Sequence, residues 1–159
     1  MQKKILFVCL GNICRSPAAE AVFLHLIKKK GLAGQFFVDS AGTGGWHVGH
    51  KADGRMIKAA QKRGIQIDSI ARQIHLDDLE SFDVILAMDN DNLESLNSFS
   101  QEFGTQDSQT IKLILDYARN TNLIEVPDPY YGGETGFEKV LDLLEDACDG
   151  LLEQLILKE

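Results

Sequence analysis

The run from Lys4 to Cys9 limits the possible folds more than any other part of the chain. It carries Ile, Leu, Phe and Val in succession, which predicts a strand buried on both faces. Further apolar runs and helical patterns follow: strands are expected at 36–39, 83–88 and 111–115, and helices at 16–30, 53–63 and 137–155. Strands that alternate with helices predict an α/β fold, with a parallel sheet covered on both faces and a site at the carboxyl ends of its strands.

The length and charge of the chain narrow the classes of function. Its 159 residues fit one compact domain, expected over residues 1–159. A net charge of −8 argues against nucleic acid as a partner, because no basic surplus exists to bind phosphates along a strand. No apolar stretch is long enough to cross a membrane, so no membrane partner is expected. Three cysteines cannot all pair, and no secretion signal is recognisable, so a cytoplasmic location is expected.

The turn after the first strand combines a cysteine at the strand end with an arginine at the start of a helix. Gly11 and Asn12 tolerate left-handed backbone angles, so this short loop can curl until its N–H groups converge on one point. Converging amides next to a helix N-terminus bind anions, and an arginine fork can hold two phosphate oxygens. We call residues 9–16 the phosphate loop. The residues expected to bind phosphate are Leu10, Gly11, Asn12, Ile13, Cys14, Arg15 and Ser16.

Cys9 would lie at the base of the phosphate loop. The positive field that binds phosphate also stabilises a thiolate, which can attack phosphorus from behind. Ser16 can donate a hydrogen bond to the sulfur, and the same serine is expected to cap the following helix, with Pro17 in the first helical position. The loop therefore predicts Cys9 as a nucleophile and Arg15 as a phosphate clamp.

The segment Val8–Pro17 closely resembles the phosphate loop of the low-molecular-weight protein tyrosine phosphatases. The resemblance extends over almost the whole chain, through segments 38–43, 71–73, 82–83, 87–89, 92–93 and 128–132. It implies a small doubly wound, flavodoxin-like sheet of four parallel strands with helices on both faces. It also implies hydrolysis of phosphotyrosine in proteins through a phosphocysteine on Cys9, without metal or cofactor. Inorganic phosphate and other oxyanions are the implied inhibitors.

The resemblance also implies a hydrogen-bond network that supports the phosphate loop. Asn12, Ser16 and Ser40 correspond to members of this network. Many family members carry a histidine in it, where this chain has Ser69. A serine side chain is shorter, so the network is expected to be bridged differently here.

Asp128 is the expected general acid. A phenolate leaves poorly near neutral pH, because the pKa of phenol is about 10, so a proton donor is required. Pro127 and Pro129 fix their own backbone angles and hold Asp128 in a stiff segment. Residue types alone leave a surface turn equally possible, since the sequence gives no distance to Cys9. The resemblance assigns Asp128 the role of general acid, and later of base.

Aromatic residues are candidates for the walls of a slot that holds the substrate's ring. Trp46, Tyr130 and Tyr131 can stack on such a ring, and Ile13 adds an apolar branched side chain beside it. Trp46 follows the stretch Gly42–Gly45, which suits a mobile loop. These four residues form the expected substrate pocket.

Cys14 is a candidate redox partner of Cys9. Both thiols lie in one tight loop, so a disulfide between them is plausible after a modest rearrangement. Cys14 could then trap an oxidised Cys9 before the damage becomes irreversible. Cys148 lies on the apolar stripe of the last helix and is expected to be structural. His47 and His50 lack further ligands at suitable spacing, so no metal site is expected.

Three alternative functions remain open. Protein arginine phosphatases resemble this chain but usually have threonine where Ile13 stands. An arsenate reductase would need a further pair of cysteines near the site, which Cys148 alone does not supply. A non-catalytic phosphate-binding adaptor has nothing to favour it, because Cys9, Arg15 and Asp128 are all present.

Overall fold

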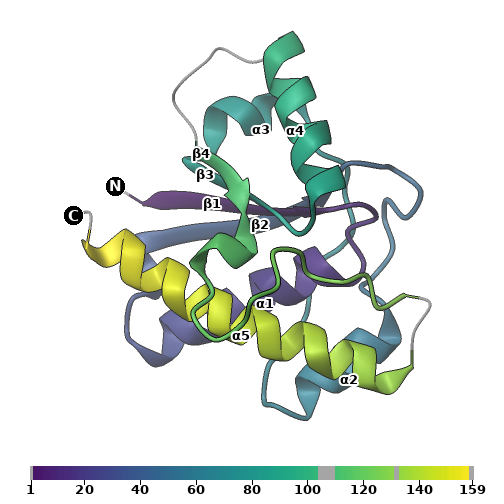
Figure 1. The fold of residues 1–159 in the computed structure, drawn as a ribbon, viewed down its shortest axis with the longest axis vertical. Coiled ribbons are helices and arrows are strands. Elements are labelled where there is room, and N and C mark those ends of the chain that lie inside the picture. Colours follow the sequence, from purple (N-terminus) through teal and green to yellow (C-terminus); the bar gives the residue numbers. More distant parts are fainter. Residues whose placement is uncertain (1, 104–109, 131–132, 158–159) are drawn as a thin grey trace.

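The computed structural model describes residues 2–103, 110–130 and 133–157. Its centre is a sheet of parallel strands in the order β2-β1-β3-β4 (Figure 1). The strands are β1 (Lys3–Cys9), β2 (Phe36–Gly42), β3 (Val84–Ala87) and β4 (Thr110–Leu113). The predicted α/β fold, with four parallel strands, is confirmed.

Helices cover both faces of this sheet (Figure 1). One face carries α1 (Arg15–Lys29), α2 (Gly54–Gln61) and α5 (Glu134–Leu157), and the other carries α3 (Leu76–Ser81) and α4 (Asn90–Phe103). Because successive strand residues point to opposite faces, β1 contributes to two cores. Ile5 and Phe7 pack below α1 and α5, whereas Leu6 and Val8 pack below α3 and α4. In the described parts of the chain, no helix has the length and apolarity needed to cross a bilayer.

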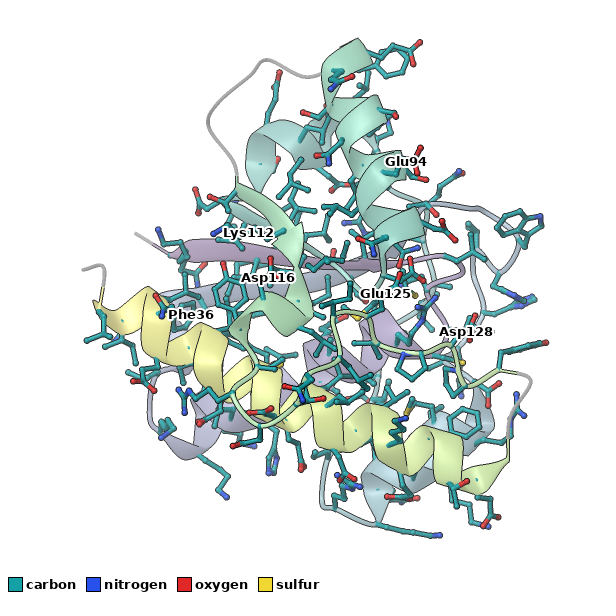
Figure 2. All side chains as sticks on the ribbon, in the orientation of Figure 1. Phe36, Glu94, Lys112, Asp116, Glu125 and Asp128 are labelled. Carbon is teal, nitrogen blue, oxygen red and sulfur yellow. The ribbon has the colours of Figure 1, made fainter. Side chains whose placement is uncertain are left out.

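The strand order places the candidate site. β1 pairs with β2 on one side and with β3 on the other, and ligands of such sheets bind beyond the carboxyl ends of the strands where the order reverses. Cys9 is the last residue of β1 and lies opposite Gly42 of β2. Figure 2 shows Asp128 at this same end of the sheet, with Phe36, the first residue of β2, at the other end.

The start of α1 differs from the prediction. The helix begins at Arg15, its cap residue is Cys14, and no side chain caps it. Ser16 and Pro17 are therefore the second and third helical residues. Ser16 does not act as the cap because its hydroxyl is engaged by groups of the phosphate loop.

Two elements of the second half were missed or misplaced. Helix α4 was not predicted, because only Asn92 and Leu96 are buried along it, too few to give an apolar stripe. The fourth strand ends at Leu113, and the chain turns into a short 3-10 helix, η2 (Ile114–Tyr117), which packs on α5. The sequence pattern of η2 is apolar enough to resemble a strand. In the first half of the chain, another short 3-10 helix, η1 (Ala33–Gln35), precedes β2.

Candidate active site

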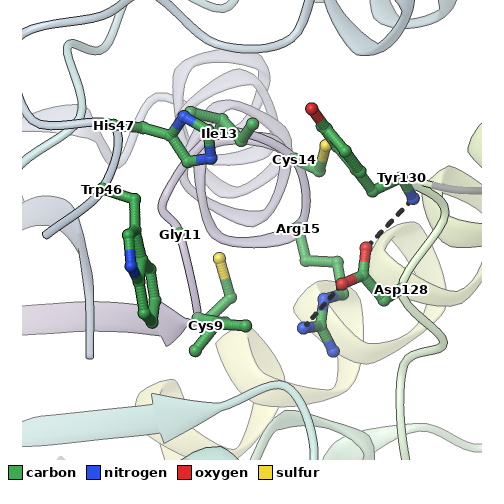
Figure 3. Close-up of a pocket in the computed structure, with 10 residues that line it drawn as sticks. Cys9, Gly11, Ile13, Cys14, Arg15, Trp46, His47, Asp128 and Tyr130 are labelled. Carbon is green, nitrogen blue, oxygen red and sulfur yellow. Dashed lines mark hydrogen bonds and ion pairs between the residues drawn. The ribbon is translucent and has the colours of Figure 1, made fainter. Parts of the chain in front are cut away.

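A pocket of about 330 Å³ opens at the carboxyl end of β1 (Figure 3). Nine of its ten lining residues are predicted site residues, and the tenth is His47. The lining residues are Cys9, Leu10, Gly11, Ile13, Cys14, Arg15, Trp46, His47, Asp128 and Tyr130. The fold thus brings the predicted nucleophile, clamp and acid into one cavity. Tyr131 lies outside the described residues.

The phosphate loop curls around the sulfur of Cys9. Asn12 has a φ of 58°, the left-handed conformation expected of it. Its N–H donates to the Cys9 sulfur at 3.3 Å, and the Ser16 hydroxyl lies 3.0 Å from the same sulfur. The sulfur therefore lies next to two groups that can donate a hydrogen bond to it, at the start of α1.

The Asn12 side chain holds the loop from below and does not line the pocket. Its amide Nδ2 donates to the Ser16 hydroxyl at 2.8 Å, and its Oδ1 accepts the backbone N–H of Arg72 at 3.0 Å. Since the Ser16 oxygen accepts from Asn12, its own hydrogen can go to the Cys9 sulfur at 3.0 Å or to the more distant Ala41 carbonyl at 3.5 Å. This arrangement fixes the left-handed turn and directs a donor at the sulfur.

The third predicted support residue, Ser40, has a different partner. Its hydroxyl donates to Oε1 of Glu20 on α1 at 2.6 Å. Burial raises the pKa of Glu20 to about 7, and the nearby Asp39 adds to the rise. Ser69 is half-buried, and the Asn12 side chain is instead bridged to the backbone of Arg72. Glu20 was not singled out from the sequence, because one glutamate on a helix gives no signal before its depth is known.

Arg15 is buried, and its guanidinium is held by two groups from distant segments. Nη1 donates to Asp89 Oδ2 at 2.7 Å and to the Val126 carbonyl at 3.0 Å. Burial lowers the pKa of Arg15, but Cys9 and Asp89 raise it, and the net change is upward. Asp89 also accepts the N–H of Asn92 at the start of α4. The guanidinium of Arg15 is therefore held in place by groups of the protein itself.

Asp128 lies on the opposite side of the pocket from the indole of Trp46 (Figure 3). Its Oδ1 accepts the Tyr130 N–H at 3.0 Å, and its Oδ2 lies 3.7 Å from Arg15 Nη2. Its side chain is 43% exposed, so a proton can be exchanged with solvent. These contacts place a carboxyl group beside the guanidinium of Arg15; its role as general acid stays a prediction.

The pocket walls use glycines for close approach. The indole of Trp46 is 71% exposed and lies over Gly44, where any Cβ would overlap the ring. The imidazole of His47 approaches Gly11 in the same way, so that a Cβ there would lie 3.0 Å from Cδ2. His47 was not among the predicted site residues, because its distance to the phosphate loop cannot be seen in the sequence. The glycines thus seat two ring side chains of the pocket.

Burial raises the pKa of both other cysteines. Burial raises the pKa of Cys14 to about 12, with a further rise from Asp53. Burial also raises the pKa of Cys148, which is fully buried in the core. All three cysteines are unpaired. Among the described residues, no group of three or more potential metal ligands is found.

Comparisons with known proteins show the family of the chain. The model of the family described as "Low molecular weight phosphotyrosine protein phosphatase" matches residues 4–159. A low molecular weight protein-tyrosine-phosphatase of Bacillus subtilis is 46% identical, covering 95% of this chain and 94% of its own length. The structure of an Entamoeba histolytica protein tyrosine phosphatase with Hepes in the active site has a TM-score of 0.90 and 47% identity, covering 97% of both chains. The Drosophila arginine phosphatase has a TM-score of 0.91 and 33% identity, covering 96% of this chain and 97% of its own.

Proposed function

Because the chain belongs to the low molecular weight phosphotyrosine protein phosphatase family, we propose that it hydrolyses phosphotyrosine in proteins, and small aryl phosphates, through a phosphocysteine on Cys9. One observation carries the proposal. The sulfur of Cys9 receives the Asn12 N–H and lies beside the Ser16 hydroxyl, in the pocket that also holds Arg15 and Asp128. The reaction needs no metal or cofactor.

In the first step, the Cys9 thiolate attacks phosphorus in line with the bond to the phenol oxygen. The S–P bond forms and the P–O bond breaks. The Asp128 carboxyl gives its proton to the departing oxygen, which would otherwise leave as a poor phenolate. Arg15 and the loop N–H groups hold the equatorial phosphate oxygens and stabilise their charge. Asp89 orients Arg15 through Nη1.

In the second step, water attacks the phosphocysteine. The Asp128 carboxylate, now deprotonated, takes a proton from that water, and the Cys9 thiolate leaves. Inorganic phosphate is released, and it should also inhibit competitively, as should other oxyanions. Hepes carries a sulfonate, so its presence in the Entamoeba active site agrees with an oxyanion site here.

The walls of the pocket favour an aromatic substrate. Trp46 and Tyr130 lie on opposite sides of the cavity (Figure 3), so a phenyl ring can pack between them. Ile13 lines the same cavity and would crowd the polar guanidinium of a phosphoarginine. The assignment of Tyr131 to the wall remains a prediction.

Turnover of aryl phosphate by two variants tests this proposal. Cys9→Ser should abolish turnover but retain phosphate binding. Asp128→Ala should lower kcat about 100-fold or more while leaving substrate binding comparatively intact. Trapping of ³²P-labelled enzyme by acid quench should succeed with wild type and fail with Cys9→Ser. Wild-type protein that binds phosphate without turnover would instead be an adaptor.

A comparison of phosphopeptides decides between the related activities. Matched peptides carrying phosphotyrosine or phosphoarginine should be hydrolysed with a preference for phosphotyrosine. The similarity to the Drosophila arginine phosphatase makes this comparison necessary. A preference for phosphoarginine would overturn the substrate assignment, and thiol-dependent reduction of arsenate would indicate an arsenate reductase.

The proposed cytoplasmic location is supported by the three unpaired thiols.

A further inference from the structure

Asp53 connects helix α2 to the phosphate loop. Its backbone N–H donates to the Ile13 carbonyl at 2.8 Å. Its side chain caps α2 by accepting the Arg55 N–H at 2.8 Å. The backbone of one residue therefore ties the phosphate loop to a helix that lies more than 35 positions further along the chain.

The same carboxylate fixes the side chain of Arg55. Nε donates to Asp53 Oδ1 at 3.1 Å and Nη2 donates to Oδ2 at 2.9 Å, a two-point pairing of fork and carboxylate. The hydrogen bond from Arg55 lowers the pKa of Asp53, which favours the ionised form of the pair. This pairing aims the guanidinium at the neighbouring segment.

That segment carries the general acid. Arg55 Nη2 also donates to the Tyr130 carbonyl at 3.0 Å, and the guanidinium carbon lies 5.4 Å from the centroid of the Tyr130 ring. The guanidinium carbon also lies 4.8 Å from the centroid of the Phe137 ring in α5. One cation–π contact and one hydrogen bond thus join Arg55 to Tyr130. The second cation–π contact joins Arg55 to Phe137.

Asp128 lies between two anchored residues. Tyr130 donates its N–H to Asp128 Oδ1. At the other end of the segment, the Val126 N–H donates to the Met88 carbonyl at 2.8 Å, and the Val126 carbonyl accepts from Arg15. With its side chain 43% exposed, Asp128 gains little from packing, so its position depends on these anchors.

We propose that Arg55, held by Asp53, is a positioning residue that locks the general-acid segment to the phosphate loop and so sets where the proton is delivered. The inference rests on the proposed function, since it assigns Arg55 a role through Asp128. A carboxyl group displaced by about 1 Å loses much of its catalytic effect. The loss falls on substrates whose leaving group needs a proton, because an acidic phenol departs without one.

A series of aryl phosphates with phenols of increasing pKa tests the proposal through kcat/KM, which reports formation of the phosphoenzyme. In Arg55→Gln, kcat/KM for phenyl phosphate should fall about tenfold or more, whereas that for nitrophenyl phosphate should change less than about threefold. In Asp128→Ala, which lacks the proposed general acid, kcat/KM should depend most steeply on the pKa of the leaving phenol. Arg55→Lys keeps the charge but loses the fork, and should lie between wild type and Arg55→Gln.

Arg63 provides the matched control. It follows α2 and pairs with Glu138, Asp142 and Glu145 of α5, away from the pocket. In Arg63→Gln, the slope of log kcat/KM against the pKa of the leaving phenol should equal that of wild type. Both arginine side chains are at least partly exposed, 47% for Arg55 and 22% for Arg63, so both variants should fold. If Arg55→Gln fails to fold, Asp53→Asn, which keeps a capping oxygen but loses the charge, takes its place.

The outcomes separate the inference from the function on which it depends. A wild-type slope in Arg55→Gln, or an equal fall for every substrate, overturns the positioning role. A fall in kcat/KM for nitrophenyl phosphate but not for phenyl phosphate would also overturn it. Failure of the proposed function is seen elsewhere, as wild-type protein without aryl phosphate turnover or as active Cys9→Ser.

Discussion

At the scale of single residues, the site depends on which partner each polar hydrogen finds. Ser16 could cap α1 or face Cys9, and the amide of Asn12 decides the matter by donating to its oxygen. The serine hydrogen is then available to the sulfur 3.0 Å away. A hydrogen bond to a charged group contributes about 1.5–3 kcal/mol, which is enough to change thiolate reactivity by an order of magnitude.

Replacement of Ser16 tests this arrangement. Ser16→Ala should slow alkylation of Cys9 by iodoacetamide about tenfold at mildly acidic pH, because the thiolate loses a donor. Ser16→Thr retains the hydroxyl and should react at close to the wild-type rate. Mass spectrometry of the alkylated protein locates the label. Equal rates for Ser16→Ala and wild type would show that the hydroxyl does not stabilise the sulfur.

We predict that Cys14 protects Cys9 from irreversible oxidation. Peroxide would convert the Cys9 thiolate to a sulfenic acid, with peroxide reduced to water, and the Cys14 thiol would then form a disulfide and release water. The high pKa of Cys14 keeps it protonated, so peroxide should react first with Cys9. After peroxide and then added thiol, wild type should recover most of its activity and Cys14→Ser only a small part. Full recovery of Cys14→Ser would remove the protective role.

At the scale of elements, close contacts decide how helices meet the rest of the fold. Helix α5 packs against η2, and Gly150 makes the contact possible because any Cβ there would overlap the Tyr117 carbonyl. A glycine inside a helix is normally unfavourable, so this one is expected to be required by packing. The contact fixes η2, which lies in the stretch of chain between β4 and the segment that carries Asp128.

Gly150→Ala should lower the free energy of unfolding by about 1–3 kcal/mol, because η2 must move away from α5. Gly54→Ala is the matched control, since Gly54 also lies in a helix but has open space around it. It should be neutral or slightly stabilising. Urea unfolding of both variants measures the difference. A stable Gly150→Ala protein would mean that η2 shifts at no cost.

At the scale of the whole molecule, the stability of the fold should depend on the protonation of Glu20. This carboxyl lies between α1 and β2, where Ser40 donates to it and Asp39 and Arg72 are the neighbouring charges. Burial raises its pKa from 4.5 to about 7, so the folded protein holds a proton that the unfolded chain releases. The stabilising effect of that proton is complete below pH 4.5 and is lost as the pH rises through about 7.

Glu20→Gln keeps an acceptor for Ser40 and removes the titration. The variant should be more stable than wild type by on the order of 2 kcal/mol above pH 7, and the gap should close toward pH 5. Urea unfolding at both pH values measures the gap. Glu94→Gln, at an exposed position of α4 (Figure 2), should show no such dependence. A constant gap for Glu20→Gln would refute the assignment.

The sequence by itself determined the parts of this protein that depend on neighbouring residues. The apolar run of β1, the turn at Asn12 and the alternation of strands and helices are local patterns, and they predicted the sheet and the phosphate loop. Cys9, Arg15 and Asp128 were predicted from residue types and from the resemblance to the family. Helix α4 was not predicted, because it buries too little apolar surface to give an apolar stripe in the sequence.

The tertiary structure decided the contacts between segments that are distant in the chain. The partner of Asn12 is the backbone of a residue 60 positions away, Asp89 orients Arg15 across 74 positions, and Arg55 reaches Tyr130 across 75. Sequence patterns cannot show these pairs, because a hydrogen bond forms only when donor and acceptor lie within a few tenths of an ångström of about 2.9 Å. Such distances exist only after the strands and helices have packed.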